Sequence, residues 1–579
     1  MDADTVRPLE KPVMTALVLG PLLRHVSERT ATIWVETDRP CEVHVSTGAH
    51  GVEAAARTFT AHGHHYALVD VDGLEPGARI PYTVALDGET VWPEAGSPFP
   101  ASEIRTMAPV GMVRISFGSC RRSPDRAGVH GLDALSAFAY RLASTAGAVP
   151  GVPSSGVAAG DGAVWPDALL MVGDQIYADE LGEEMLAYLD ERRGPDTEPK
   201  GEVADFEEYT KLYELAWHED PAVRWLLSTL PTFTVFDDHD VRDDWNTSHA
   251  WRQEMWRQPW WRARITGGIG SYWVYQHLGN LSPEGRAADP VYAAVRAAAA
   301  QGADVGKIID EFAERADREP ATARWSYAHD WGGTRLIVVD SRASRLLTAD
   351  RRGMLDDDEF AWLDGRVQGG MEHLLIASSL PFLLPRSIHH AEAWNEAMAA
   401  GAWGKRSAQV AEGIRQAADL EHWAAFDRSF RTVSEYVLAV ARGERGTAPV
   451  SISFLSGDIH YSYLARVTKP DTGGTDAAGR AIGGTAITQV VCSPLRNPLA
   501  GKFRKANKVA GTPLLPGMFR MLAKSAKVPV PPMKWKITDG PWFDNSIATV
   551  ELSGRRCHVR WDTPSTATEL VEMGRAHIS

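Results

Sequence analysis

The chain has 579 residues, 44% of them hydrophobic and 23% charged, which is the composition of a folded globular protein and excludes large-scale disorder. A domain usually has about 50–250 residues, so this length predicts two or three domains. The formal net charge of −15 disfavours broad nucleic-acid binding, because an acidic surface repels a polyanion, whereas a small anionic substrate stays possible because a metal ion can supply positive charge locally.

The ends of the chain and its cysteines narrow the class of protein further. Cys41, Cys120, Cys492 and Cys557 form no CxxC pair, so neither a disulfide scaffold nor a zinc finger is expected. The N-terminus lacks a basic region followed by an apolar stretch and lacks a twin-arginine signal. No run of about 18 apolar residues occurs. We therefore expect a soluble, cytoplasmic protein without membrane insertion, although a chain trimmed of its signal would look the same.

Residues 12–108 predict an N-terminal β-sandwich of the immunoglobulin or fibronectin type. Short runs in which apolar and polar residues alternate are separated by Gly, Pro and Asp. The clearest runs are Thr30–Thr37, Cys41–Thr47, Tyr66–Gly73 and Ile80–Gly88. No catalytic residue types cluster here, so a structural or substrate-shaping role is expected.

The pattern changes at residue 109, where a second domain over 109–579 is predicted. Its apolar runs are continuous, as in strands covered on both faces, and polar residues follow each run. These runs are Val113–Cys120, Ala168–Tyr177, Thr232–Asp240, Arg335–Arg342, His373–Phe382 and Ile452–Tyr461. Helical stretches such as Asp358–Gln368 and Ser407–Phe426 lie between them. This is an α/β architecture, whose functional groups collect at the carboxyl ends of the strands.

Residue types that bind metal ions follow several of these strands. They are Cys120, Asp174, Tyr177, Asp238, His239, Asp458 and His460. Each has an ordinary alternative: a buried thiol for Cys120, a turn or helix cap for Asp174, and packing for Tyr177. The cluster Asp237–Asp240 is harder to explain without a cation, because its carboxylates repel one another. Several such strand ends in one domain predict a shared metal site.

Two segments near the C-terminus complete the prediction. A basic insertion or lid is expected over 501–540, because 501–536 carries nine lysines and arginines and no acidic residue. It could cover an anionic substrate or touch a membrane surface, but a solvated helical surface is the favoured interpretation. C-terminal strands are expected over 541–579, with a hairpin formed by Ile547–Gly554 and Arg555–Asp562.

The order of four short motifs resembles a known family. GSC at 118–120, GDQIY at 173–177, DDHD at 237–240 and GDIHY at 457–461 occur in the order seen in the alkaline phosphatase D (PhoD-like) family of metallophosphoesterases. VVDSR at 338–342 and CSPLRNP at 492–498 are similar to that family as well. The resemblance covers Val113 to Pro498. It implies a four-layer α/β (α+β) fold, a β-sandwich flanked by helices, with an N-terminal all-β accessory domain.

The resemblance also implies the roles of individual residues. The implied metal ligands are Cys120, Asp174, Tyr177, Asp238, Asp458 and His460, with Asp174 bridging two ions and His239 over the leaving group. Family members of this type are associated with ferric iron and calcium, which thiolate, phenolate and carboxylate ligands would suit; manganese and zinc are also compatible. The DxH and GHxH motifs of the wider superfamily are replaced here by GSC and GDIH.

These observations predict metal-dependent hydrolysis of phosphomonoesters or phosphodiesters. Two metals would lower the pKa of a shared water, and the resulting hydroxide would attack phosphorus. Arg121, Arg342 and Arg496 could contact phosphate oxygens, although a surface or ion-pair role is the favoured interpretation of each one taken individually. Two alternatives stay open: a different dinuclear metalloenzyme, or a non-catalytic binding protein on the same fold. The substrate, the choice between mono- and diester, and the oligomeric state are not predicted.

Overall fold

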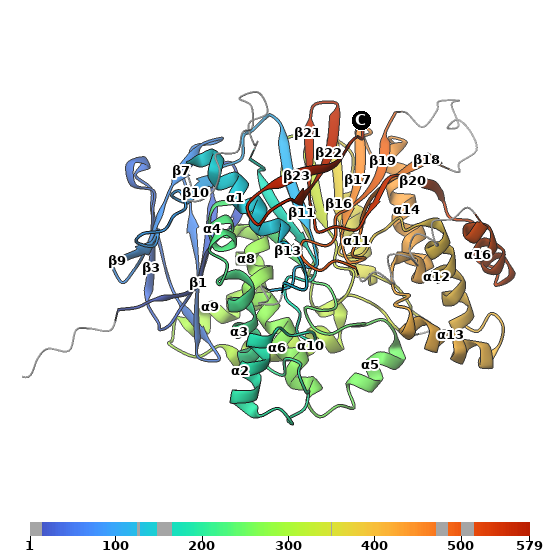
Figure 1. The fold of residues 1–579 in the computed structure, drawn as a ribbon, viewed down its shortest axis with the longest axis horizontal. Coiled ribbons are helices and arrows are strands. Elements are labelled where there is room, and N and C mark those ends of the chain that lie inside the picture. The colour runs from blue at the N-terminus through green and yellow to red at the C-terminus, as the bar shows by residue number, and fades with distance from the viewer. Residues whose placement is uncertain (1–13, 124–127, 148–164, 349, 471–483, 500–513) are drawn as a thin grey trace, which may run out of the picture.

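The computed structural model describes residues 14–579 except 124–127, 148–164, 349, 471–483 and 500–513. Figure 1 shows an all-β region at the left, two large sheets in the centre, and helices below and to the right of them. In the described residues no helix combines the length and apolar character needed to cross a membrane.

The N-terminal region is an antiparallel sandwich, as its alternating pattern predicts. Its strands are β1 (Leu17–Val26), β2 (Ala31–Thr37), β3 (Glu42–Ser46), β4 (Glu53–Arg57), β5 (Phe59–Ala61), β6 (His64–Val71), β7 (Arg79–Pro81), β8 (Thr83–Leu86), β9 (Glu89–Trp92) and β10 (Glu103–Arg105), with a short 3₁₀ turn η1 (Gly48–His50). One sheet has the order β1-β2-β6-β5, the other β4-β3-β8-β9, and β7 pairs with β10. Aliphatic side chains of both sheets, such as Ile33, Val45 and Val84, form the core between them.

The outer face of sheet β1-β2-β6-β5 packs against the rest of the chain. β2 is buried along its whole length, and its outer face carries Thr32, Trp34 and Glu36. Trp34 donates from Nε1 to the carbonyl of Val274 at 3.0 Å, and Arg24 donates to the carbonyl of Gln276 at 2.7 Å. Both acceptors lie in the π-helical turn η2 (Tyr272–His277), so the sandwich docks by specific polar contacts as well as by apolar area.

Two sheets lie face to face in the rest of the molecule. The strands are β11 (Val113–Gly118), β12 (Ala168–Val172), β13 (Thr232–Val235), β14 (Tyr327–Trp331), β15 (Thr334–Val338), β16 (His373–Ala377), β17 (Ser451–Ser456), β18 (Ser462–Pro470), β19 (Ala486–Val491), β20 (Met533–Trp542), β21 (Ile547–Ser553), β22 (Arg556–Pro564) and β23 (Leu570–His577). The six-stranded sheet has the order β13-β12-β11-β21-β22-β23, and the seven-stranded sheet β14-β15-β16-β17-β19-β18-β20. Their inner faces share one core, to which Phe117, Val172, Leu375 and Leu455 belong.

Helices cover the two outer faces, which makes four layers. They are α1 (Ala134–Ala146), α2 (Glu183–Arg193), α3 (Phe206–Trp217), α4 (Pro221–Thr229), α5 (His249–Met255), α6 (Trp261–Ser271), α7 (Leu278–Asn280), α8 (Pro283–Ala288), α9 (Pro290–Ala299), α10 (Gly306–Arg318), η3 (Pro320–Thr322), α11 (Asp357–Arg366), α12 (Arg386–Ala399), α13 (Lys405–Ala417), η4 (Trp423–Ala425), α14 (Asp427–Ala441) and α16 (Leu514–Ser525). The helices around α1, α3, α4 and α6 share a core with the six-stranded sheet. Those around α11 and α14 share one with the seven-stranded sheet.

The predicted fold class is confirmed in both parts. The six predicted strands of the second domain exist, but each ends before the polar residues that come after it, because those residues turn away from the sheet. The predicted helix over Ser407–Phe426 is wrong in its second half: α13 ends at Ala417, and 418–422 form a turn that runs toward the centre of the molecule. The domain boundaries at 108 and 109 stay a prediction. The segment 501–540 lies partly outside the described residues, and its described part contains α16 and the start of β20.

Candidate metal centre

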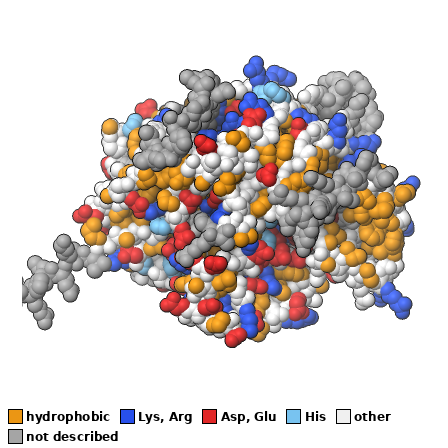
Figure 2. Space-filling model, in the orientation of Figure 1, with side chains coloured by type: hydrophobic (Ala, Val, Ile, Leu, Met, Phe, Trp, Pro, Cys, Tyr) orange, Lys and Arg blue, Asp and Glu red, His pale blue; other side chains and the backbone are white. Residues whose placement is uncertain are grey.

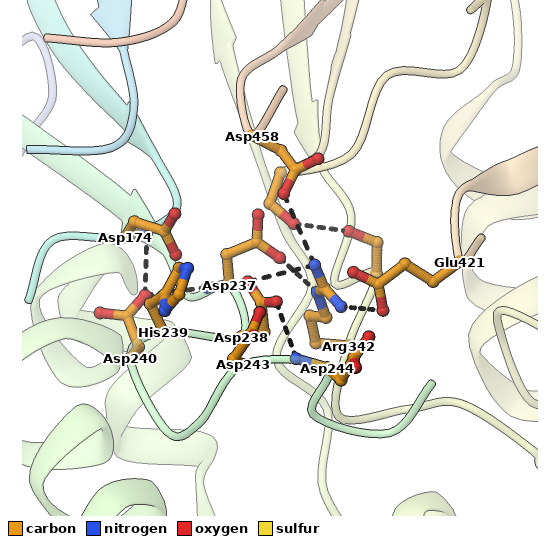
Figure 3. A network of polar contacts seen from close by, with 12 residues as sticks. Asp174, Asp237, Asp238, His239, Asp240, Asp243, Asp244, Arg342, Glu421 and Asp458 are labelled. Carbon is orange, nitrogen blue, oxygen red and sulfur yellow. Dashed lines mark hydrogen bonds and ion pairs between the residues drawn. The ribbon is translucent and has the colours of Figure 1, made fainter. Parts of the chain in front are cut away.

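The carboxyl ends of parallel strands from both sheets meet at one place. β11, β12 and β13 run parallel in one sheet, and β15, β16, β17 and β19 in the other. The loops that follow them carry Cys120, Asp174, Asp238, Arg342 and Asp458. Figure 3 shows the acidic part of this centre, with side chains from both sheets pointing toward one another.

Four residues of the centre hold a backbone conformation that is unusual for their type. Cys120, Asp174, Asp458 and His460 have φ angles of 56°, 54°, 66° and 57°. Residues other than glycine adopt this left-handed region at a cost of roughly 1 kcal/mol or more each, so such outliers persist where the surrounding structure or a function requires them. All four are metal ligands in the prediction from the sequence, and each lies in the irregular segment that follows a strand.

Gly173 allows the loops to approach one another. Its φ is 102°, and a Cβ atom there would lie 2.7 Å from Cβ of Asp237 and 3.0 Å from Cβ of Ser379. Any side chain at 173 would therefore push the loop after β12 away from the loops after β13 and β16. The carboxylate of Asp240 joins two of these loops, because it accepts the amide hydrogens of Asp174 at 3.0 Å and Asp237 at 2.8 Å.

Cys120, Asp174 and His460 form the first group of possible metal ligands. One ligand atom from each lies within 4.8 Å of the others. The Tyr177 hydroxyl is at the same place, 3.4 Å from Oδ2 of Asp174, and it accepts a hydrogen bond from the Asn497 side chain at 3.0 Å. The group thus combines sulfur, carboxylate, imidazole and phenol.

The Cys120 side chain is fully buried, and its surroundings disfavour a free thiolate. Burial, together with the charges of Asp174 and Asp458, raises the pKa of the thiol well above its ordinary value, while Ser493 donates to the sulfur at 3.2 Å. A thiolate here therefore needs a cation. Desolvation lowers the pKa of His460 to about 4, so its imidazole is neutral and can donate a lone pair.

Asp174, Asp238 and His239 form the second group, within the same limit of 4.8 Å. Asp174 belongs to both groups, and its buried Oδ1 has no hydrogen-bond partner in the described part of the chain. Nδ1 of His239 lies 2.9 Å from Asp179, which fixes the ring. Burial alone would lower the pKa of His239, but the charge and hydrogen bond of Asp179 outweigh it and raise that pKa well above its usual value.

Asp237, Asp238 and Asp458 form a third group, and Arg342 lies among them. The guanidinium is fully buried, 3.2 Å from Oδ1 of Asp238 and 3.6 Å from Oδ1 of Asp458, and it pairs with Asp237 as well. It also pairs with Glu421, which lies in the turn after α13. Arg342 thus neutralises carboxylates inside the protein, and its predicted contact with phosphate stays a prediction.

The residues that support Asp458 were not predicted. Nε2 of His422 lies 3.0 Å from Oδ2 of Asp458, and its Nδ1 lies 2.8 Å from Glu392 on α12. His422 and Glu421 fell inside a stretch with helical periodicity, so nothing in the local pattern indicated that they leave the helix. Asn497 could have been predicted, because it is part of the CSPLRNP motif.

The side chains of the arginines near the centre point in different directions. Arg121 is buried and binds Asp133 at 2.9 Å and the Ala216 carbonyl at 2.7 Å. Its backbone pairs with that of Arg496 in a short parallel bridge, which joins the loops after β11 and β19. Arg122, which the sequence did not single out, has its guanidinium carbon 4.8 Å from the centre of the Tyr177 ring. A pocket beside Tyr177 is lined by Arg122 together with Leu181, Met185 and Leu212.

These donors fit metal ions well. Burial raises the pKa of Asp174 well above its usual value, and the charges of Asp237, Asp238 and Asp240 add to this, so without a cation the carboxylates resist ionisation together. A cation beside Asp174 would remove that penalty and occupy the unpaired Oδ1. A thiolate, a phenolate, a neutral imidazole and a carboxylate are all metal ligands.

Comparison with known proteins agrees with this chemistry. A family model described as PhoD-like phosphatase matches residues 157–513, which is more than half of the chain. The chain belongs to the PhoD-like phosphatase family. A second model, a domain of unknown function called DUF7800, matches residues 14–104. A search of curated proteins gave no match.

A solved structure shares the fold of this PhoD-like phosphatase chain. A structure titled "Structure of PhoD" aligns with a TM-score of 0.56 at 12% identity, over 99% of this chain and 94% of that one. A purple acid phosphatase from yellow lupin (Lupinus luteus) seeds aligns with a TM-score of 0.45 at 10% identity, over 95% of this chain and 73% of that one. The family model confirms the resemblance inferred from the four motifs as family membership. Membership and the ligand groups support a metal-binding phosphatase.

Proposed function

We propose that this PhoD-like phosphatase hydrolyses phosphoesters at a dinuclear metal centre in which Asp174 is shared by the two ions. The observation that carries the proposal is that Asp174 belongs to two separate groups of possible ligands, one with Cys120 and His460, the other with Asp238 and His239. A carboxylate has two oxygen atoms and can serve one ion with each. Its Oδ1 has no other partner among the described residues.

The two groups differ in the metals that they suit. Sulfur from Cys120 and phenolate from Tyr177 favour iron, whereas the oxygen ligands around Asp238 favour a harder ion such as calcium. Manganese and zinc are compatible with the same donors. When bound, the two ions would supply a nucleophile at neutral pH and neutralise charge that develops on the phosphoryl oxygens.

Side chains of this chain complete the site. Asp179 accepts the Nδ1 hydrogen of His239, which leaves Nε2 to hold a proton for the departing oxygen. Arg122 lies over the Tyr177 ring and lines the adjoining pocket, where its guanidinium can bind a phosphate oxygen or the departing group. Asp458, held by His422, completes the ligands near Asp238.

Replacing Asp174 tests the proposal. Asp174→Ala should lose both activity and stoichiometric metal, measured with a mono-aryl and a bis-aryl phosphate in parallel with elemental analysis. Asp562→Ala removes another buried carboxylate, one that pairs with Arg141 on α1 and belongs to none of the ligand groups, and serves as the control. Activity of Asp174→Ala at the wild-type level would refute the shared ligand. The ratio of the two wild-type activities decides between monoesterase and diesterase.

A further inference from the structure

One flank of the molecule presents apolar side chains to solvent. Within the described residues, six of the thirteen large hydrophobic side chains that are exposed lie on or beside α13 and α16: Trp403, Val410, Ile414, Met518, Met521 and Val530. We call this set the apolar flank. Both helices pack against α12. Figure 2 shows hydrophobic side chains gathered at the right of the molecule, where Figure 1 places these helices.

α13 is oriented opposite to an ordinary surface helix. It buries Arg415, which pairs with Glu396 at 2.6 Å and Glu412 at 2.7 Å, and it turns Val410, 64% exposed, to solvent. A surface helix of a globular protein normally buries its apolar stripe and exposes its charges. Here the helix uses its charged residue for attachment to α12, and the apolar stripe stays free.

α16 also exposes large apolar side chains. Met518 and Met521 lie three residues apart, on the outer side of the helix, and Met521 is 68% exposed. Ala523, in the last turn of α16, and Ala526, just after its end, are buried. Apolar area left in water costs about 25 cal/mol per Å², so a flank with several such side chains indicates a surface that something else covers.

The charges around the apolar flank are positive. Lys405 and Arg406 follow Trp403, and Lys524 and Lys527 follow Met521; all four are exposed and form no ion pair within the described residues. Residues 514–536 contain five basic and no acidic residues, in a chain whose formal net charge is −15. The nearby carboxylates Glu396 and Glu412 are already paired with Arg415.

We propose that the apolar flank docks the protein on an anionic lipid bilayer, with Trp403, Val410, Met518 and Met521 entering the headgroup region. Helices that lie on bilayers have this composition: an apolar face with Trp or Leu, edged by Lys and Arg. The cations meet anionic headgroups, each contributing to binding. A second copy of the chain fits less well, because symmetric contact would bring Lys524 and Lys527 of two molecules together.

Vesicle co-sedimentation of the full chain tests the proposal. The protein should bind vesicles of phosphatidylcholine with phosphatidylglycerol, bind vesicles of phosphatidylcholine alone at least about tenfold more weakly, and detach as salt rises. Val410→Ser with Met521→Ser should lower binding at least about tenfold, as should Lys524→Glu with Lys527→Glu. Thermal unfolding should be the same for all variants, since these side chains lie on the surface.

Matched substitutions control for general effects. Val110→Ser with Val571→Ser removes two exposed valines outside the apolar flank, and Lys307→Glu reverses an exposed charge on α10. These variants should bind vesicles as the wild type does. The proposal is overturned if the wild type does not bind anionic vesicles, or if the variants of the apolar flank bind them unchanged. It is also overturned if sedimentation shows a dimer that these variants dissociate.

Discussion

Nε2 of His422 lies 3.0 Å from Oδ2 of Asp458, and Nδ1 of the same ring lies 2.8 Å from Glu392. A histidine between two carboxylates can hold only one orientation, so it fixes the direction of Asp458. Oδ1 of Asp458 is thereby turned toward Arg342 and the third group of carboxylates. His422 is a positioning residue for a predicted metal ligand.

Removing this support should weaken metal binding without removing a ligand. Partners that orient metal ligands typically change affinity by about 10–100-fold, so we expect that range for His422→Gln and a smaller loss for Glu392→Gln. The loss of affinity is measured as the metal that each variant retains after dialysis against increasing concentrations of chelator. His373→Gln, at a buried histidine hydrogen-bonded to Ser451 away from the centre, should retain metal as the wild type does. If His422→Gln retains as much metal as the wild type does, His422 does not act as a positioning residue for Asp458.

His239 should matter most when the departing alcohol is a poor leaving group. Proton donation contributes about 10²–10⁴-fold to such steps, so His239→Gln should lose about that much on an alkyl phosphoester and far less on a p-nitrophenyl ester. Asp179→Asn should shift activity in the same direction by a smaller factor. An equal loss on both substrates, together with lower metal content, would instead indicate that His239 is a ligand of the second group.

Tyr177 should give the protein a colour if iron is bound beside it. A phenolate on ferric iron absorbs visible light, so Tyr177→Phe should abolish or strongly shift the band at unchanged protein concentration. Tyr209→Phe is the matched control, because Tyr209 is also buried and its hydroxyl has no hydrogen-bond partner among the described residues. A visible band that survives unchanged in Tyr177→Phe contradicts the assignment, as does a purified protein without iron.

Arg342 and Arg122 should respond in opposite ways to replacement by methionine. Arg342 lies buried among carboxylates, and removal of one partner from a buried ion pair costs about 3–5 kcal/mol, so Arg342→Met should lower the melting temperature markedly. Arg122→Met should unfold near the wild-type temperature and raise KM, because its side chain lines the pocket beside Tyr177. A stable Arg342→Met with only a raised KM would favour the phosphate contact predicted from the sequence.

His64 should make the attachment of the N-terminal sandwich sensitive to pH. Its Nδ1 lies 2.9 Å from Glu36, and its Nε2 lies 2.9 Å from Glu207 on α3. Burial lowers the pKa of His64, but the two carboxylates outweigh it and raise the pKa to about 9. The pKa of His64 in the folded protein thus exceeds its value of about 6.5 in the unfolded chain. The stability that the protonated His64 contributes is therefore complete below about pH 6.5 and is lost as pH rises through about 9.

The melting temperature of the wild type should therefore fall between about pH 6.5 and 9.5. The full change in the pKa of His64 corresponds to about 3 kcal/mol, which solvent screening at the partly exposed Glu207 reduces to about 1 kcal/mol. His64→Gln should remove this part of the pH dependence and should be less stable than the wild type mainly at the lower pH. His50→Gln, at an exposed histidine of the same region, should keep the wild-type profile. Parallel profiles for His64→Gln and wild type would show that the contact contributes nothing.

The sequence alone determined the fold class and most of the centre. Continuous apolar runs indicate strands covered on both faces, and parallel strands deliver the residues after their carboxyl ends to one edge of the sheet. The positions of Cys120, Asp174, Asp238 and Asp458 after such runs were therefore informative, and the order of the motifs identified the family. Which of these residues bind metal stays a prediction until metal is measured.

The tertiary structure decided which side chains surround them. Arg121 and Arg122 are neighbours in the chain, yet one points to Asp133 and the other lies over Tyr177, because successive side chains of an extended segment face opposite ways and only the packing fixes which faces the centre. Glu421 and His422 reach the centre because the helix ends at Ala417, where its periodicity gives no stop signal. Contacts between residues far apart in the chain depend on how the two sheets and their helices pack, and local sequence does not encode that packing.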